Sequence, residues 1–359
     1  MIQVTRTDLP DFDLYVSRIR HLWDSKWISN NGDFLQKLEK EIETHLGVNG
    51  KVVATTNGTI ALQIALMSAG IKGEVITTPF TFAATVNALI WAGITPVFAD
   101  IRPDTYCIDS ASVVQKITNK TSAILAVHVY GNPCDVDSLE KIAKEYRLKL
   151  VFDAAHAFGV EYNGVSVLNF GHVSTMSFHP TKVFHTIEGG AVVSGDEDIV
   201  RKSKLLRNHG IVSEDIVEMA GTNGKMDEFR AIMGICNLET VNGAIERRKV
   251  LYEYYKKKFG NSVVFQRLMA SEYNYIYMPV LFETEAIRNS AYRVLFENGI
   301  KARKYFYPLI PDFSYIASTG DTPVARGITE RILCLPLYPE LNEKDIDRIV
   351  NIVMGVICG

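Results

Sequence analysis

The chain has 359 residues, of which 47% are hydrophobic, and its formal net charge at pH 7 is −3. A chain of this length can bury a large core spread over two or three domains, and its nearly balanced charge gives no electrostatic reason to expect binding to nucleic acid. The five cysteines form no CxxC pair, the N-terminus lacks the apolar core of a signal peptide, and no apolar run approaches the roughly 20 residues of a membrane span. We therefore expect a cytoplasmic protein with reduced thiols, no metal site and no membrane partner.

The first part of the chain is predicted to be helical. Residues 11–46 have a helical pattern, interrupted by a turn from Ser29 to Asp33 whose composition favours non-helical backbone angles. From Val52 onward, short apolar or β-branched runs predict seven strands, at 52–55, 74–78, 96–99, 122–129, 150–152, 173–177 and 191–193. Helical stretches at 60–68, 83–92 and 138–146 separate the earlier strands. This alternation predicts an α/β fold with a mainly parallel seven-stranded sheet covered by helices on both faces.

A second, smaller α/β domain is expected toward the C-terminus. A long helix is predicted around 226–258, and the residues after it mix strands and helices. We place the large domain at residues 1–245 and the small domain at 246–359, although no Pro or Gly cluster marks the boundary.

Two polar residues follow strands of the predicted sheet, where ligands of α/β proteins gather. Asp153 comes directly after the strand at 150–152, and Lys182 lies in the polar turn 177–182. Taken alone, a lysine in a loop is usually a solvated charge and an aspartate after a strand is often a helix cap. Pyridoxal phosphate, however, needs an amine for its Schiff base and a carboxylate that keeps its pyridinium nitrogen protonated. The order and setting of Lys182 and Asp153 favour this cofactor.

A phosphate cradle is predicted at the first strand-to-helix turn. The sequence contains neither G-x-G-x-x-G nor G-x-x-x-x-G-K-[ST], which argues against a Rossmann dehydrogenase. Instead, Asn57, Gly58 and Thr59 open a helix, where backbone amides make an anion site. An ordinary helix cap by Asn57 or Thr59 is the alternative interpretation. At the next such turn, an aromatic residue of 80–82 is expected either to stack on the pyridine ring or to belong to the core.

Together these motifs resemble the DegT/DnrJ/StrS family of nucleotide-sugar aminotransferases, which have the fold type I architecture of pyridoxal phosphate enzymes. The resemblance covers nearly the whole chain. It rests on motifs at 27–32, 57–59, 79–82, 127–131, 153–156, 177–182, 188–190, 221–223 and 305–309.

The resemblance implies a role for each matching residue. Lys182 is expected to carry the cofactor and to move the proton of the reaction, and Asp153 to pair with the pyridine nitrogen. The phosphate-binding positions match Gly58, Thr59 and Ser177, the stacking aromatic matches Phe82, and Asn223 matches an asparagine that reaches the cofactor phosphate from the neighbouring subunit. A homodimer with shared active sites is therefore expected.

Three positions depart from the family pattern. His156 stands where most relatives have Gln as a hydrogen-bond partner of the cofactor's phenolic oxygen; an imidazole can also donate there, provided that a neighbour sets its tautomer. Lys225 replaces a common Arg, and an ammonium cannot reproduce the planar fork of a guanidinium, which argues against a bidentate phosphate contact at this point. Pro180 replaces a small residue and is expected to stiffen the turn.

The resemblance favours transamination over two alternatives. A related branch of sugar dehydratases has His in place of the lysine, whereas an inactive regulatory homologue would lack the lysine, the aspartate or the phosphate loop. This chain has Lys182, Asp153 and the loop at 57–59.

The implied substrates are a dTDP- or UDP-linked keto-6-deoxysugar and L-glutamate as the amino donor. The motifs at 153–159 and 184–190 look most like those of enzymes that aminate C4 of dTDP-4-keto-6-deoxyglucose to give dTDP-4-amino-4,6-dideoxyglucose, with surface glycans such as lipopolysaccharide O-antigen as the destination. Amination at C3 of a dTDP-3-keto-6-deoxyhexose is the alternative. The candidates for seating the sugar are Trp27, Asn30, His185 and Tyr305, each with a structural role as the alternative.

Overall fold

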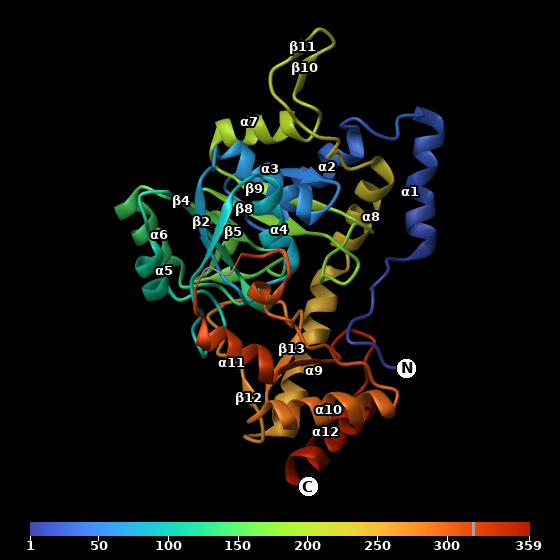
Figure 1. The fold of residues 1–359 in the computed structure, drawn as a ribbon. Coiled ribbons are helices and arrows are strands. Elements are labelled where there is room, and N and C mark those ends of the chain that lie inside the picture. Colours follow the sequence, from blue (N-terminus) through green and yellow to red (C-terminus); the bar gives the residue numbers. More distant parts are fainter. Residues whose placement is uncertain (318–319) are drawn as a thin grey trace.

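The centre of the structure, a computed structural model that describes residues 1–317 and 320–359, is a seven-stranded sheet with the strand order β1-β9-β8-β5-β4-β2-β3 (Figure 1). Within this sheet, only β9 runs antiparallel to its neighbours. The fold class and the mainly parallel seven-stranded sheet are therefore confirmed, since each predicted strand overlaps one of those observed. The strands are β1 (Lys51–Thr55), β2 (Glu74–Thr77), β3 (Thr95–Phe98), β4 (Thr121–Val127), β5 (Lys149–Asp153), β8 (Val173–Ser177) and β9 (Gly190–Ser194).

Helices cover both faces of this sheet. One face carries α3 (Gly58–Ser68), α4 (Ala83–Trp91) and α7 (Glu197–Leu206), and the other carries α2 (Asp33–His45), α5 (Ser110–Lys116) and α6 (Val136–Tyr146). Successive side chains of a strand point to opposite faces. In β1, Val53 accordingly belongs to the core beneath α3, whereas Val52 and Ala54 belong to the core beneath α2.

Four helices, at the start of the chain and after the last strand of the large sheet, differ from the sequence prediction in one respect. α1 (Phe12–Ser25) and α2 are separated by the predicted turn. The prediction of a single helix around 226–258 is wrong, because the chain forms two helices there, α8 (Glu228–Leu238) and α9 (Val241–Phe259). The break follows from a tightened last turn of α8: the backbone N–H of Thr240 donates to Asn237 O at 3.2 Å, and the Thr240 hydroxyl bonds the same carbonyl at 3.4 Å.

A second core lies below the large sheet in Figure 1. It is built from the C-terminal half of α9, from α10 (Glu285–Glu297) and α12 (Glu343–Cys358), and from a sheet of β12 (Val264–Phe265), β13 (Met278–Leu281) and β14 (Ile332–Leu335), which α11 (Pro323–Arg331) precedes. The N-terminal residues join this part, since Ile2 pairs with Ile300 and Val4 O accepts from Leu337 N at 3.1 Å. α9 passes through residue 245 without a break, so the division of the chain into 1–245 and 246–359 stays a prediction.

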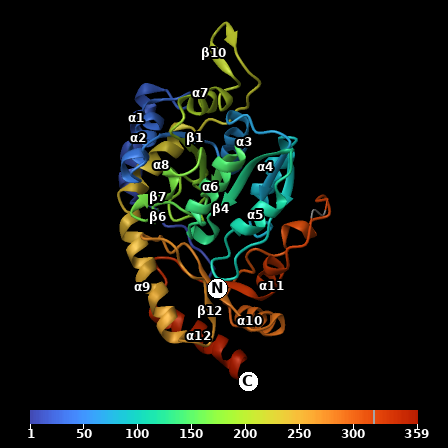
Figure 2. The same cartoon turned by 90° about the vertical axis from the view of Figure 1, so that its left-hand side faces the viewer.

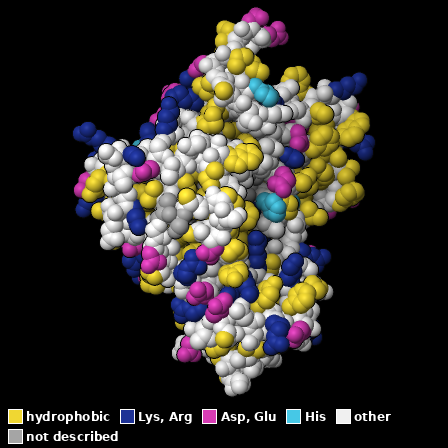
Figure 3. Space-filling model, viewed as in Figure 1, with side chains coloured by type: hydrophobic (Ala, Val, Ile, Leu, Met, Phe, Trp, Pro, Cys, Tyr) yellow, Lys and Arg dark blue, Asp and Glu magenta, His cyan; other side chains and the backbone are white. Residues whose placement is uncertain are grey.

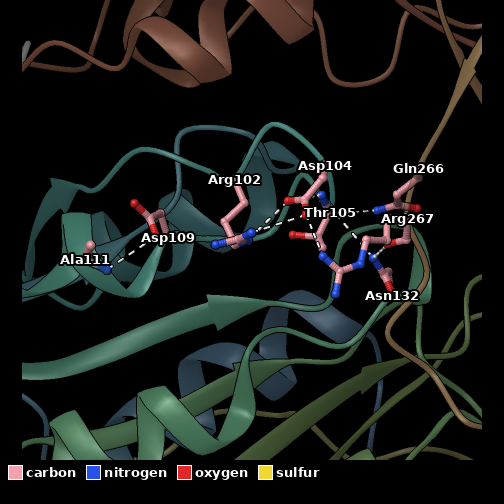
Figure 4. Close-up of polar contacts among 8 residues, drawn as sticks. All are labelled: Arg102, Asp104, Thr105, Asp109, Ala111, Asn132, Gln266 and Arg267. Atoms are coloured by element: carbon pink, nitrogen blue, oxygen red, sulfur yellow. Dashed lines mark hydrogen bonds and ion pairs between the residues drawn. The ribbon is translucent and has the colours of Figure 1, made fainter.

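A cluster of polar side chains ties the segment after β12 to the loop after β3 (Figure 4). Asp104 binds both Arg102, with 3.1 Å between Nε and Oδ1, and Arg267, with 3.0 Å between Nη1 and Oδ2. The Gln266 amide donates to Thr105 O at 2.6 Å. These bonds fix the second core against the large sheet.

Two short hairpins lie outside these sheets: β6 (Glu161–Tyr162) with β7 (Val165–Ser166), and β10 (Ile211–Ser213) with β11 (Ile216–Val217). The β10–β11 hairpin projects away from the rest of the molecule in both ribbon views (Figures 1 and 2). Its apolar side chains Ile211, Val212, Ile216 and Val217 are exposed. Within the described residues, no helix combines the length and the apolar character needed to cross a membrane.

Candidate active site

A cavity of about 360 Å³ opens at the carboxyl ends of β4, β5 and β8. Val127, Asp153 and Ser177, the last residues of these strands, line it together with the N-termini of α3 and α4. The segment after α10 contributes Arg303 and Tyr305. The cavity therefore lies where open α/β sheets bind their ligands.

Asp153 is buried in this cavity and is held from two sides. Its carboxylate accepts hydrogen bonds from Thr85 Oγ1 on α4 at 2.8 Å and from the backbone N–H of Ala155 at 3.1 Å. Burial raises the pKa of Asp153, although both hydrogen bonds and the charge of Lys182 act in the opposite direction. The contacts within the protein therefore do not fully offset the effect of burial. A further cationic partner would stabilise the ionised carboxylate.

Lys182 lies in the loop between β8 and β9, and the loop folds back on itself. The backbone N–H of Lys182 donates to His179 O at 2.9 Å, and that of Thr186 donates to Phe178 O at 3.0 Å. Burial lowers the pKa of Lys182 to about 8, with the charge of Asp153 opposing the shift and that of Arg303 adding to it. An amine with this pKa is partly neutral near pH 7, so it can act as a nucleophile and as a base.

The N-terminus of α3 forms the wall opposite these residues. Asn57 caps the helix by accepting from the Ile60 N–H at 2.9 Å, so the cap interpretation holds for this residue. Gly58 and Thr59 line the cavity, and the first N–H groups of a helix have no partner within it. A Cβ on Gly58 would lie 2.8 Å from Ser177 Cβ, so glycine is what allows α3 to approach β8 this closely. The result is a concave surface of amides and hydroxyls suited to an anion.

His156 and Thr175 show that the cavity is shaped for a polar ligand. Both line it, and His156 Nδ1 and Thr175 Oγ1 are buried without a hydrogen-bond partner among the described residues. Burial lowers the pKa of His156 well below its usual value, and the charges of Lys182 and Arg303 lower it further, so the imidazole is neutral. Buried polar atoms normally have partners, and a ligand can supply them here.

The outer wall is aromatic and cationic. Phe80 is fully buried and belongs to the core, whereas Phe82 is 49% exposed and lines the cavity, with its ring centroid 6.3 Å from that of Tyr305. The Arg303 guanidinium carbon lies 3.9 Å from the centroid of the Tyr305 ring. The two aromatic residues at 80–82 therefore differ: Phe80 belongs to the core, and Phe82 belongs to the cavity.

The structure brings eight of the predicted site residues together and leaves four apart. The cavity contains Gly58, Thr59, Phe82, Asp153, His156, Ser177, Lys182 and Tyr305. Trp27 and Asn30 line two separate cavities, and Asn223 is exposed outside all three.

His185 is the fourth residue outside the cavity, and its environment is that of a structural residue. It is 2% exposed, its Nε2 lies 2.7 Å from Asp8 O, and its Nδ1 accepts from the Ile187 N–H at 3.2 Å. Both ring nitrogens are therefore engaged within the chain.

Sequence reasoning missed Thr85 and Arg303. Thr85 lies three residues after Phe82, within the first turn of α4, and Arg303 lies two residues before Tyr305, where the chain enters a turn. A spacing of three residues places side chains on one face of a helix, so the position of Phe82 contained a signal for Thr85, whereas no such signal pointed to Arg303.

The comparisons with known proteins agree with this geometry. Residues 13–354 match the model of the DegT/DnrJ/EryC1/StrS aminotransferase family. The chain belongs to this family. One relative in the family, the dTDP-4-amino-4,6-dideoxy-D-glucose transaminase of Escherichia coli, is 39% identical over 99% of this chain and 98% of its own.

Two solved structures extend the likeness to three dimensions. The crystal structure of DesI in the presence of its TDP-sugar product has a TM-score of 0.94 and 34% identity, covering 99% of this chain and 93% of DesI. NtdA from Bacillus subtilis, with bound cofactor PMP, has a TM-score of 0.90 and 25% identity, covering 97% of this chain and 82% of NtdA.

Aminotransferases of the DegT/DnrJ/EryC1/StrS family depend on pyridoxal phosphate, so the predicted enzyme class and cofactor are confirmed. The residues of the cavity fit this group. Asp153 matches its ring nitrogen, the unpartnered His156 Nδ1 matches a polar substituent of the ring, and the α3 N-terminus with Ser177 matches its phosphate.

Proposed function

We propose that this protein transfers the amino group of L-glutamate to C4 of dTDP-4-keto-6-deoxyglucose, giving dTDP-4-amino-4,6-dideoxyglucose for surface glycans such as O-antigen. The observation that carries transamination is the convergence of the Lys182 amine and the Asp153 carboxylate in one cavity beside a phosphate-binding helix terminus. The sugar is supported by the name of the E. coli relative, which matches this chain along almost its whole length.

Some residues of the site would hold the cofactor, and others would act in the reaction. When bound, pyridoxal phosphate supplies an electron sink for the carbon that carries the amino group. Asp153, which Thr85 holds in place, would keep the ring nitrogen protonated, and His156, a neutral imidazole, would bind the phenolic oxygen. Gly58, Thr59 and Ser177 hold the phosphate.

Lys182 moves the proton between the reacting carbon and the carbon of the cofactor to which nitrogen is transferred. Because its pKa is about 8, the amine can accept a proton near neutral pH and return it in the same turnover. Phe82 and Tyr305 line the cavity beside each other, so that Phe82 would pack on the cofactor ring and Tyr305 would face the sugar. Their rings limit the access of water to the reacting atoms.

A homodimer with shared sites completes this proposal. Asn223 is exposed and lies outside the three cavities that contain the other predicted residues, as expected of a residue that serves a neighbouring subunit. Figure 3 shows apolar side chains gathered over the region of α1, where Phe12, Trp23, Trp27 and Ile28 are exposed. Burial of such a patch against a second copy removes it from water. Trp27 and Asn30 then seat the sugar from the partner side.

The regiochemistry is the point on which the main alternative differs. Amination at C3 of a dTDP-3-keto-6-deoxyhexose would use the same Lys182 and Asp153, with the sugar seated differently against Tyr305. A dehydratase is disfavoured because Lys182 is present.

One experiment tests the proposal directly. The pyridoxamine form of the enzyme is incubated with a panel of dTDP- and UDP-linked 3-keto and 4-keto sugars, and the aminated carbon is identified by mass spectrometry and NMR. Amination of dTDP-4-keto-6-deoxyglucose at C4 is expected. Selective amination of a 3-keto sugar, or of UDP-sugars alone, would show that the proposed substrate is wrong.

A further inference from the structure

Arg303 is a cationic residue of the cavity wall to which neither the fold nor the cofactor gives a role. Its backbone pairs with Cys334 at the edge of β14, through bonds of 2.9 Å and 2.8 Å. Among residues 1–317 and 320–359, its guanidinium has no hydrogen bond and no ion pair. The side chain is exposed toward the cavity, so it is open to an anionic ligand.

The guanidinium lies over the ring of the aromatic residue two positions later. Its central carbon lies 3.9 Å from the centroid of the Tyr305 ring, and Tyr305 is buried. A guanidinium stacked on a ring keeps its N–H groups at its edge, where they can bind a carboxylate through two parallel hydrogen bonds.

The position of Arg303 relative to Lys182 indicates which anion it meets. Arg303 lines the same cavity of about 360 Å³ as Lys182 and His156, so its guanidinium faces the space in which nitrogen is transferred. In an α-amino acid, the carboxylate is bonded to the same carbon as the reacting nitrogen. In a sugar nucleotide aminated at C4, the diphosphate is bonded to C1, across the ring from the reacting carbon. We propose that Arg303 binds the α-carboxylate of the amino donor, an inference that rests on the proposed transamination.

Binding of a non-reacting dicarboxylate tests this assignment without turnover. Glutarate has the carbon chain of glutamate but no amino group, so its affinity for the holoenzyme can be measured by calorimetry. Arg303→Met should weaken glutarate binding by at least about 30-fold, as is typical when one partner of a desolvated charged pair is removed. Arg303→Lys should bind it with intermediate affinity, because the charge remains and the planar fork is lost.

Two controls separate the possible outcomes. Lys304→Met removes the same charge from the next residue, whose ammonium bonds Asn289 at 2.6 Å and does not line the cavity, and should leave glutarate affinity unchanged. Binding of dTDP to Arg303→Met should also be unchanged, which in addition shows that this variant is folded.

Unchanged glutarate affinity in Arg303→Met, or a loss of dTDP affinity in place of glutarate affinity, would overturn the assignment. Failure of the proposed function is seen separately, in wild-type enzyme that aminates none of the dTDP-sugars.

Discussion

Thr85 donates a hydrogen bond to Asp153, with 2.8 Å between Oγ1 and Oδ2, and a second hydroxyl, Thr81 Oγ1, lies 2.8 Å from Thr85 Oγ1. All three side chains are buried. The bond opposes the effect of burial and stabilises the ionised form of the carboxylate. Thr85 is therefore a positioning residue for the carboxylate that we propose binds the cofactor nitrogen.

Asp153→Asn should lower turnover by at least about 100-fold while leaving the fold intact, because the amide keeps the shape and removes the charge that holds the ring nitrogen protonated. Thr85→Val should lower turnover by roughly 10-fold, in line with the loss of one hydrogen bond to a charged group. Steady-state kinetics and circular dichroism measure both effects. Near-normal turnover of Asp153→Asn would refute the pairing.

Borohydride reduction of the purified yellow holoenzyme should fix the cofactor covalently on Lys182, since this amine lies in the cavity beside Asp153. Peptide mapping by mass spectrometry locates the label. Lys182→Ala should take up no label under the same conditions. A label on another lysine of the wild-type protein would mean that the site is wrongly assigned.

The reactivity of the Lys182 amine in the cofactor-free protein should rise with pH around a midpoint near its pKa of about 8. Burial disfavours the ammonium form, so the amine is protonated below this midpoint and neutral above it. In Asp153→Asn the midpoint should fall, because the opposing negative charge is lost, and in Arg303→Met it should rise. Acetylation with a limiting reagent, followed by mass spectrometry, measures each midpoint. A midpoint near that of exposed lysines would contradict the buried environment.

Mixing Lys182→Ala with Asn223→Ala should restore activity if Asn223 serves the neighbouring subunit. In a mixed dimer, one active site then contains both substitutions and the other contains neither. The comparison requires that each variant alone is strongly impaired and that subunit exchange is confirmed by mass spectrometry. If both conditions hold and the mixture is no more active than its parents, Asn223 acts within its own chain.

Arg207→Met should destabilise the fold by about 3–5 kcal/mol, the usual cost of leaving one charge of a buried pair without its partner. Arg207 is 4% exposed and binds Glu39, Ala54 O at 2.8 Å and Asn31 Oδ1 at 3.0 Å. Arg201→Met on α7 is the matched control, because its partner Glu218 is exposed and such surface pairs contribute up to about 1 kcal/mol. Urea unfolding followed by circular dichroism gives both values, and equal effects would show that burial of the pair is unimportant.

The sheet could be predicted from the sequence because its strands are short apolar runs separated by helices of regular spacing. The apolar pattern did not predict the end of a helix that is set by a local hydrogen bond. Nothing in the apolar pattern around 226–258 indicates that Asn237 O will be taken by Thr240 and that α8 will end there.

The gathering of Asp153, Gly58 and Ser177 in one cavity could be predicted because these residues adjoin strands whose ends meet at one edge of the sheet. The substrate side was harder, because it depends on how separate segments pack. His185 lies only three residues after Lys182, yet its ring turns away to Asp8 and Ile187. Arg303 reaches the cavity through the packing of a distant segment, which periodicity does not report.

The order of the cavity residues along the chain has a consequence for biosynthesis. The cavity residues that we propose bind the cofactor run from Gly58 to Lys182, whereas Arg303 and Tyr305 line the outer wall. Proteins fold from the N-terminus as they leave the ribosome. During translation, the residues of this chain that we propose to hold the cofactor therefore emerge well before those that line the outer wall of the cavity.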